Sequence, residues 1–173
     1  VVVVLVALAL VLIPSVPISI IAAIIIIIFG FFFATVSSRM VGLVGSSNNP
    51  VSGMAIATLL IATMILKATG KTGIQGMTMA ICIGTVICII AAMAGDTSQD
   101  LKTGYLLGAT PKTQQIGELI GVVASGLAIG GVLYLLDAAW GYGGAEVPAP
   151  QAGLMKMIVE GIMGGNLPWA LVF

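Results

Sequence analysis

The chain has 173 residues, of which 60% are hydrophobic and only 7% are charged, so a soluble domain of this size could not cover its apolar surface. Six Lys and Arg balance six Asp and Glu, and this charge balance argues against binding nucleic acid through a basic surface. The sequence contains no histidine, so catalysis and metal ligation by histidine are excluded within it. From the high hydrophobic content we expect a protein embedded in a lipid bilayer.

Six segments are apolar and long enough, or nearly so, to cross a bilayer, whose hydrocarbon core of about 30 Å requires about 20 helical residues. Their apolar character is continuous rather than alternating, which favours helices over a β-barrel. We therefore predict an all-α, polytopic helical membrane protein, with a single transmembrane domain over residues 1–173 and broken or re-entrant polar segments. The predicted helices comprise residues 1–13, 18–36, 51–66, 76–94, 114–136 and 154–173, the last interrupted at 164–168.

The two N-terminal predicted helices are apolar almost throughout. No initiator Met and no basic segment precedes residues 1–13, which argues against a signal peptide. Since the chain also ends in an apolar run, we expect an internal or trimmed piece of a longer chain; the alternative is that disordered ends are missing from it. Helix 18–36 contains five consecutive isoleucines, Ile24 to Ile28, which suit contact with hydrocarbon.

An uncharged polar segment precedes the third predicted helix. Residues 45–53 read Gly-Ser-Ser-Asn-Asn-Pro-Val-Ser-Gly, and helix 51–66 is short for a bilayer. A short helix beside a broken polar stretch is typical of discontinuous helices in transporters, where freed backbone groups face substrate or ions. Alternatively, Ser47 or Asn49 caps the helix that Pro50 begins. The candidates for lining a site are Ser46, Ser47, Asn48 and Asn49.

The basic residues do not orient the chain by the positive-inside rule. The predicted helices place three on each side of the membrane: Arg39, Lys102 and Lys112 on one, and Lys67, Lys71 and Lys156 on the other. If the polar stretches near Arg39 and Lys102 fold back into the protein, only Lys67, Lys71 and Lys156 count toward the positive-inside rule. In that case the loop 67–75 faces the cytoplasm.

Two short patterns that would indicate a metal or a nucleotide do not hold. Cys82 and Cys88 are six residues apart in one predicted helix, so they point to different faces and cannot form a disulfide within it. We interpret them as small apolar residues, and we expect neither a metal site nor a cofactor. Gly70-Lys71-Thr72 resembles the end of a phosphate loop, but Ile65 stands where that motif requires glycine.

The most polar segment of the chain is 95–113, which we expect to separate two helices. It contains two of the six acidic residues, Asp96 and Asp100, which are four residues apart and would share one face of a helix. Lys102 is a candidate to neutralise one of them. Ionisable groups near a membrane interior are usually paired or functional, whereas a solvated loop would leave them without a special role.

Small residues recur in the fifth predicted helix at the spacing that lets membrane helices approach closely. Because they lie on two faces, we expect this helix to be buried among others. One set is Gly117, Gly121 and Ser125, and the other is Gly126 and Gly130.

Two glutamates lie within apolar helices. Glu118 is one turn into helix 114–136, where it either complements the positive end of the helix dipole or relays protons. Glu160 follows Lys156 by four residues, which predicts either an ordinary ion pair along the helix or a buried coupling acid.

Residues 95–111, Gly-Asp-Thr-Ser-Gln-Asp-Leu-Lys-Thr-Gly-Tyr-Leu-Leu-Gly-Ala-Thr-Pro, resemble a signature of the oligopeptide transporter (OPT) superfamily. Its yellow stripe-like plant members carry a similar acidic stretch, followed by a Gly-rich helix and a short Pro-containing loop, matched here by 115–131 and 146–150. The segment 48–54 is similar to the prokaryotic branch. The resemblance extends over about residues 39–173.

This resemblance implies a cation-coupled secondary transporter, usually driven by protons, that imports small oligopeptides or metal-chelate complexes. It implies a multi-pass protein of a bacterial or archaeal inner membrane. The expected partners are lipid, substrate, protons and the remaining helices of a larger transporter, because family members have many more helices. A homo-oligomer is left open.

The matching positions suggest site residues. Asp96, Gln99, Asp100, Lys102 and Tyr105 would form a conformational or substrate-path element. Asn48 and Asn49 are candidates for a polar lining, and Glu118 for the proton-coupling acid. Transport would proceed by alternating access around a polar site.

Two other classes of function compete with the transporter. A channel or a non-transporting membrane subunit would require a continuous polar pore. An intramembrane enzyme would require a catalytic dyad, but Asp96 and Asp100 belong to one helix, whereas intramembrane aspartyl catalysis draws its acids from two. We therefore expect no enzymatic activity.

Overall fold

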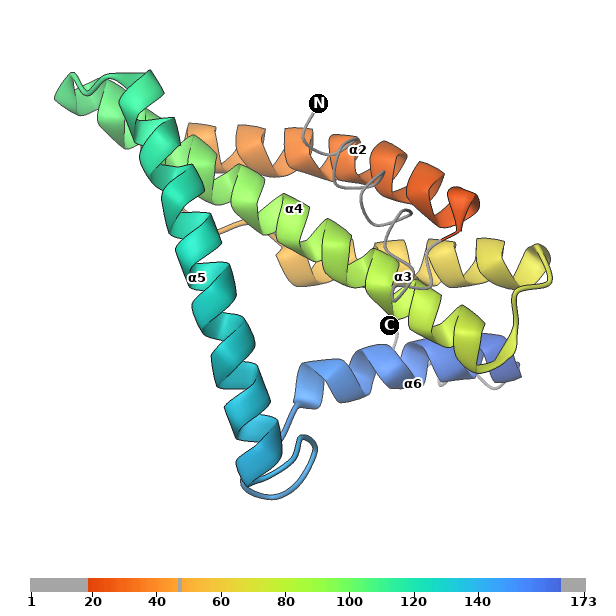
Figure 1. Ribbon diagram of the computed structural model, residues 1–173. Coiled ribbons are helices and arrows are strands. Elements are labelled where there is room, and N and C mark those ends of the chain that lie inside the picture. The colour runs from red at the N-terminus through yellow and green to blue at the C-terminus, as the bar shows by residue number, and fades with distance from the viewer. Residues whose placement is uncertain (1–18, 47, 166–173) are drawn as a thin grey trace.

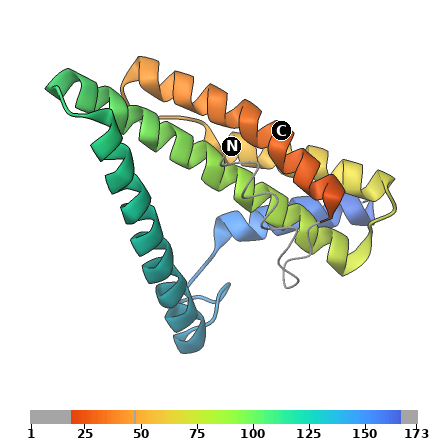
Figure 2. The same cartoon turned by 45° about the horizontal axis from the view of Figure 1, so that its top comes forward.

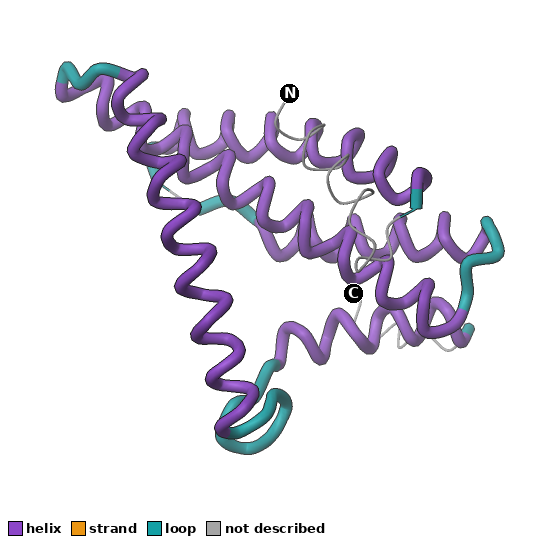
Figure 3. Tube along the Cα trace, viewed as in Figure 1, coloured by secondary structure: helices purple, strands orange, loops and turns teal. Residues whose placement is uncertain are grey.

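The computed structural model describes residues 19–46 and 48–165, and within them the chain is helical with no strand (Figure 1, Figure 3). Four of the helices are long and apolar enough to cross a membrane, which confirms the prediction of an all-α polytopic membrane protein. The first predicted helix, 1–13, lies outside the described residues, as do Ser47 and the last part of the sixth. The helices are α2 (Ile20–Val44), α3 (Val51–Ala68), α4 (Gly73–Leu107), α5 (Pro111–Ala139) and α6 (Pro150–Gly164).

Helices α2, α3 and α4 pack side by side, and α6 lies along α3 and α4 (Figure 1, Figure 2). Their core is apolar: Ile26 of α2, Leu59 of α3 and Ile83 of α4 are fully buried together with Val159 of α6. Gly84 permits the close approach of α3 and α4, because a β-carbon there would lie 2.8 Å from Leu59 Cγ. This is the use of small residues that membrane helix packing favours.

Local sequence signals set several helix ends. The Ser19 hydroxyl accepts a hydrogen bond from the Ala22 N–H and so caps α2. Helices α2, α4 and α6 each end at a glycine with positive φ, a conformation that costs a residue with a β-carbon more than it costs glycine. These residues are Gly45, Gly108 and Gly165.

The polar segment after residue 94 continues a helix, although we expected it to separate two helices. Helix α4 runs unbroken for 35 residues, and at 1.5 Å per residue it is about 52 Å long. A helix satisfies its own backbone hydrogen bonds, so polar side chains on its surface do not interrupt it. Because α4 exceeds the roughly 30 Å of a hydrocarbon core, part of it extends toward or beyond one membrane boundary.

Helix α5 has no buried residue in the described part of the chain, whereas its glycines predicted burial among other helices. Among the described residues, a β-carbon at Gly117 or Gly121 would meet nothing within 4 Å. The reason is geometric: after the turn that follows α4, α5 runs obliquely away from the other helices (Figure 2). Its small-residue faces are therefore uncovered by the described helices.

Candidate functional site

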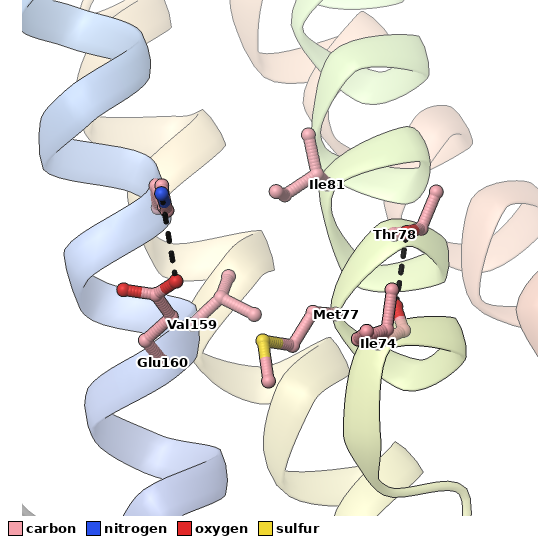
Figure 4. Close-up of a pocket in the computed structure, with 7 residues that line it drawn as sticks. Ile74, Met77, Thr78, Ile81, Val159 and Glu160 are labelled. Carbon is pink, nitrogen blue, oxygen red and sulfur yellow. Dashed lines mark hydrogen bonds and ion pairs between the residues drawn. The ribbon is translucent and has the colours of Figure 1, made fainter.

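A first cavity, of about 220 Å³, lies between the first turns of α4 and the middle of α6 (Figure 4). Its wall is mostly apolar, and the Thr78 hydroxyl is already satisfied because it donates to the Ile74 carbonyl at 2.9 Å. The charged groups at this cavity are Lys156 and Glu160, which form an ion pair of 3.8 Å and are both exposed. Glu160 is thus part of an ordinary i, i+4 pair and not a buried coupling acid.

Replacing Glu160 with Gln is expected to change little. An exposed ion pair contributes about 0–1 kcal/mol, because water and salt screen it and two long side chains lose freedom in forming it. The free energy of unfolding of the Glu160→Gln variant in detergent should fall within about 1 kcal/mol of the wild-type value. A larger loss would show that the pair is buried in the assembled protein.

A second cavity, of about 300 Å³, lies between the C-terminal part of α4 and the first half of α5. It brings together three of the acids predicted from the sequence, Asp96, Asp100 and Glu118. The turn between the two helices explains this, because Asp100 lies seven residues before the end of α4 and Glu118 seven residues after the start of α5. The full lining is Met93, Asp96, Thr97, Asp100, Glu118, Gly121, Val122 and Ser125.

Glu118 is the least solvated acid of this cavity. Its carboxylate faces Thr97 and Asp100. Its Oε1 atom is covered and finds no hydrogen-bond partner among residues 19–46 and 48–165. A covered carboxylate oxygen without a donor is costly to keep charged, and a second carboxylate nearby adds repulsion.

The other predicted residues of the α4 segment do not line this cavity. Lys102 is exposed and forms no ion pair with Asp96 or Asp100 in the described part of the chain, so the predicted neutralisation is wrong. The physical reason is helix periodicity: Lys102 lies about 200° around α4 from Asp100. Gln99 is half-buried and Tyr105 is exposed, and both lie outside the cavity.

Asn49 connects the α2–α3 segment to α4. Its Nδ2 group donates to the Ser37 hydroxyl and, at 3.4 Å, to the Ala91 carbonyl. The fully buried Ser37 hydroxyl in turn donates to the Ala91 carbonyl at 2.6 Å. Asn49 therefore does not cap α3, which begins after Pro50 without a side-chain hydrogen bond.

The lining role of the 45–53 segment stays a prediction. Ser46 and Asn48 are exposed, and neither of the two cavities includes them or Asn49. Ser47 lies outside the described residues.

Sequence reasoning missed Thr97 and Gln114. Thr97 lines the second cavity from the same face of α4 as Asp96 and Asp100, and helical spacing alone would have found it once this segment was known to be helical. Gln114 donates from Nε2 to the Asp100 carbonyl at 2.6 Å, a contact across the turn that no spacing predicts. In the described ranges no group of three or more His, Cys, Asp or Glu side chains could hold a metal ion.

Comparison with known proteins places these features in a family context. The family pattern described as "OPT oligopeptide transporter protein" matches residues 1–173. A Haemophilus influenzae protein named as a predicted oligopeptide transporter is 34% identical over 162 residues, covering 83% of this chain and 26% of that protein. A predicted metal-nicotianamine transporter of Oryza sativa is 34% identical over 95 residues, or 52% of this chain and 14% of that protein. No solved structure matches, and the chain spans about a quarter of the Haemophilus relative.

Proposed function

The chain belongs to the OPT oligopeptide transporter family, and on this basis we propose that it forms part of a proton-coupled secondary transporter. The substrates we propose are small oligopeptides or metal-chelate complexes, after the names of the bacterial and plant relatives. The bacterial relative supports a place in a bacterial inner membrane.

The observation that carries the proposal is the position of Glu118. It lies in an apolar helix long enough to cross a membrane, yet its side chain borders a cavity shared with Asp96 and Asp100. The lining contains three carboxylates and no basic side chain, so it favours protons and cationic groups over anions. An acid in such a place is a functional candidate, because an ionisable side chain within a membrane helix is energetically unfavourable and is usually kept for a function.

Proton movement is coupled to substrate movement if the protonated and the charged forms of Glu118 favour different conformations of the transporter. When Glu118 binds a proton, its repulsion with Asp100 disappears and the covered oxygen no longer carries charge. The conformation that closes the cavity is then favoured, whereas release of the proton to the other side restores the open one. A proton gradient thus biases the direction in which the transporter moves its substrate.

The experiment uses the complete transporter in liposomes that contain a pH-sensitive dye. Small peptides and metal chelates are offered in turn under an imposed pH gradient, and proton uptake and substrate accumulation are recorded together. We expect proton uptake that requires one of these substrate classes.

Two other outcomes would reject the proposal. A steady proton or ion leak with every addition would favour a channel. Folded protein that moves neither protons nor any of the substrates would favour a non-transporting membrane subunit.

A further inference from the structure

The turn between α4 and α5 is tight and internally bonded. Helix α4 ends at Gly108, whose φ is 73°, and the Ala109 N–H donates back to the Gly104 carbonyl at 2.8 Å. Pro111 then starts α5, where its fixed φ suits the first helical position. The two helices therefore leave a common corner that has few freely rotating residues.

The side chain of Gln114 crosses this corner. Its Nε2 group donates to the Asp100 carbonyl at 2.6 Å, and its amide lies against Gly104. A β-carbon at Gly104 would overlap the amide oxygen and carbon of Gln114, so this arrangement requires glycine. We call the contact between Gln114, Gly104 and the Asp100 carbonyl the corner latch.

The corner latch and the acidic cavity lie on the same two helix faces. Gly104 follows Asp100 by four residues on α4, and Glu118 follows Gln114 by four residues on α5. The two helices thus contact each other at two successive positions. The corner latch lies nearest the α4–α5 turn, and Asp100 faces Glu118 one helical turn further from that turn.

The described part of the chain holds α5 against α4 near the turn through the corner latch and, further along, through the residues of the second cavity. None of the residues of α5 is buried among the described residues, and the Gln114 side chain gives α5 a hydrogen bond to the backbone of α4. Because a helix is stiff, a small change of angle at the corner alters the distance between Asp100 and Glu118 and moves the far end of α5 much more.

We infer that Gln114 is a positioning residue: through the corner latch it sets the angle between α4 and α5, and so the separation of Glu118 from Asp100. Its effect on the angle stands on the geometry alone, while its consequence for transport rests on the proposed function. A single hydrogen bond at an exposed corner is weak enough to open and close during a transport cycle.

The angle is measured by pulsed electron spin resonance on the complete protein, with Cys82, Cys88 and any cysteine outside residues 1–173 replaced by alanine. Spin labels are attached at Ile89→Cys and Leu127→Cys, two exposed positions on α4 and α5. Leu127 lies about 20 Å along α5 from Gln114, so a change of about 10° moves its label by about 3–4 Å. We expect Gln114→Leu to shift or broaden the distance distribution, and Gly104→Ala to do the same from the other side of the contact.

The matched control is Gln115→Leu, the same chemical change at an exposed neighbour with no side-chain hydrogen bond in the described residues. Its distribution should equal that of the labelled parent protein. If Gln114→Leu also leaves the distribution unchanged, the inference is overturned. If Gln114→Leu does not fold, the comparison of Gly104→Ala with the parent decides in its place.

Transport measured on the same variants separates this inference from the proposed function. We expect Gln114→Leu to raise the proton concentration needed for half-maximal uptake several-fold, with a smaller effect on the maximal rate. A parent protein that does not transport would refute the proposed function but leave the distance result valid. A shifted distance without a change in proton dependence would show that Gln114 sets the angle but does not position Glu118.

Discussion

Replacing Glu118 with Gln is expected to abolish the accumulation of substrate against a gradient in the complete transporter. Gln has the same shape as protonated Glu but cannot release a proton, so the variant stays in the state that the proton-loaded acid favours. General acid–base groups in enzymes contribute roughly 100-fold or more to rate, and we expect proton-driven uptake to fall by a comparable factor. The measurement is the initial rate of substrate and proton uptake under an imposed pH gradient.

Substrate exchange at equal pH on both sides distinguishes loss of coupling from loss of folding. Exchange needs substrate binding but no net proton movement, so Glu118→Gln should retain it. Glu160→Gln is the matched control, because it makes the same substitution in a helix where the carboxylate is exposed and ion-paired. Uptake by Glu118→Gln at the wild-type rate would contradict the assignment of Glu118 as the coupling acid.

Replacing Gly95 with Ala is expected to lower the stability of the helix bundle. A β-carbon at this position would lie 2.9 Å from Asn49 Nδ2, 3.0 Å from Ser37 Oγ and 3.2 Å from Val41 Cγ2. Asn49 and Ser37 belong to the hydrogen-bonded link between the α2–α3 segment, α2 and the Ala91 carbonyl, so they cannot move apart without weakening it. Overpacking and a strained buried hydrogen bond together predict a loss of about 1–3 kcal/mol.

Thermal unfolding in detergent, followed by circular dichroism, checks this prediction. Gly53→Ala is the matched control, because Gly53 is also helical but its nearest neighbour, Pro50 Cβ, would be 3.9 Å from the added carbon. There alanine should be neutral or should stabilise the helix by up to about 1 kcal/mol through its higher helix propensity. Equal stability of the two variants would show that the link through Asn49 is loose.

Hydropathy and motif were sufficient to identify the type of protein. The apolar segments 18–36 and 51–66 predicted α2 and α3. Helix α3 begins at Val51 as expected, whereas α2 continues beyond residue 36 to Val44. The signature at residues 95–111 indicated the family to which the chain belongs. The length of an apolar segment and the family signature are both local properties of the sequence. Each can be recognised without knowing which residues are neighbours in space.

Polar composition led to a wrong prediction of a loop at the C-terminal part of α4, where the helix continues beyond its apolar residues. Residues 95–107 look like a loop, yet they extend α4, because backbone hydrogen bonds within a helix do not depend on whether its side chains are apolar. The glycines of α5 predicted burial, but glycine only permits a close approach. Whether a neighbour occupies that space depends on how the helices are arranged.

The sequence by itself determined that this protein is a helical membrane protein of the OPT family with acids in its polar segment. Only the tertiary structure decided which of these acids meet, placing Glu118 of α5 opposite Asp100 of α4. It also decided that Asn49 bonds to Ser37 and Ala91 rather than capping α3. The physical reason is that such contacts join residues 12 to 42 positions apart, so they depend on the angle of a turn and the packing of helices, which no local pattern records.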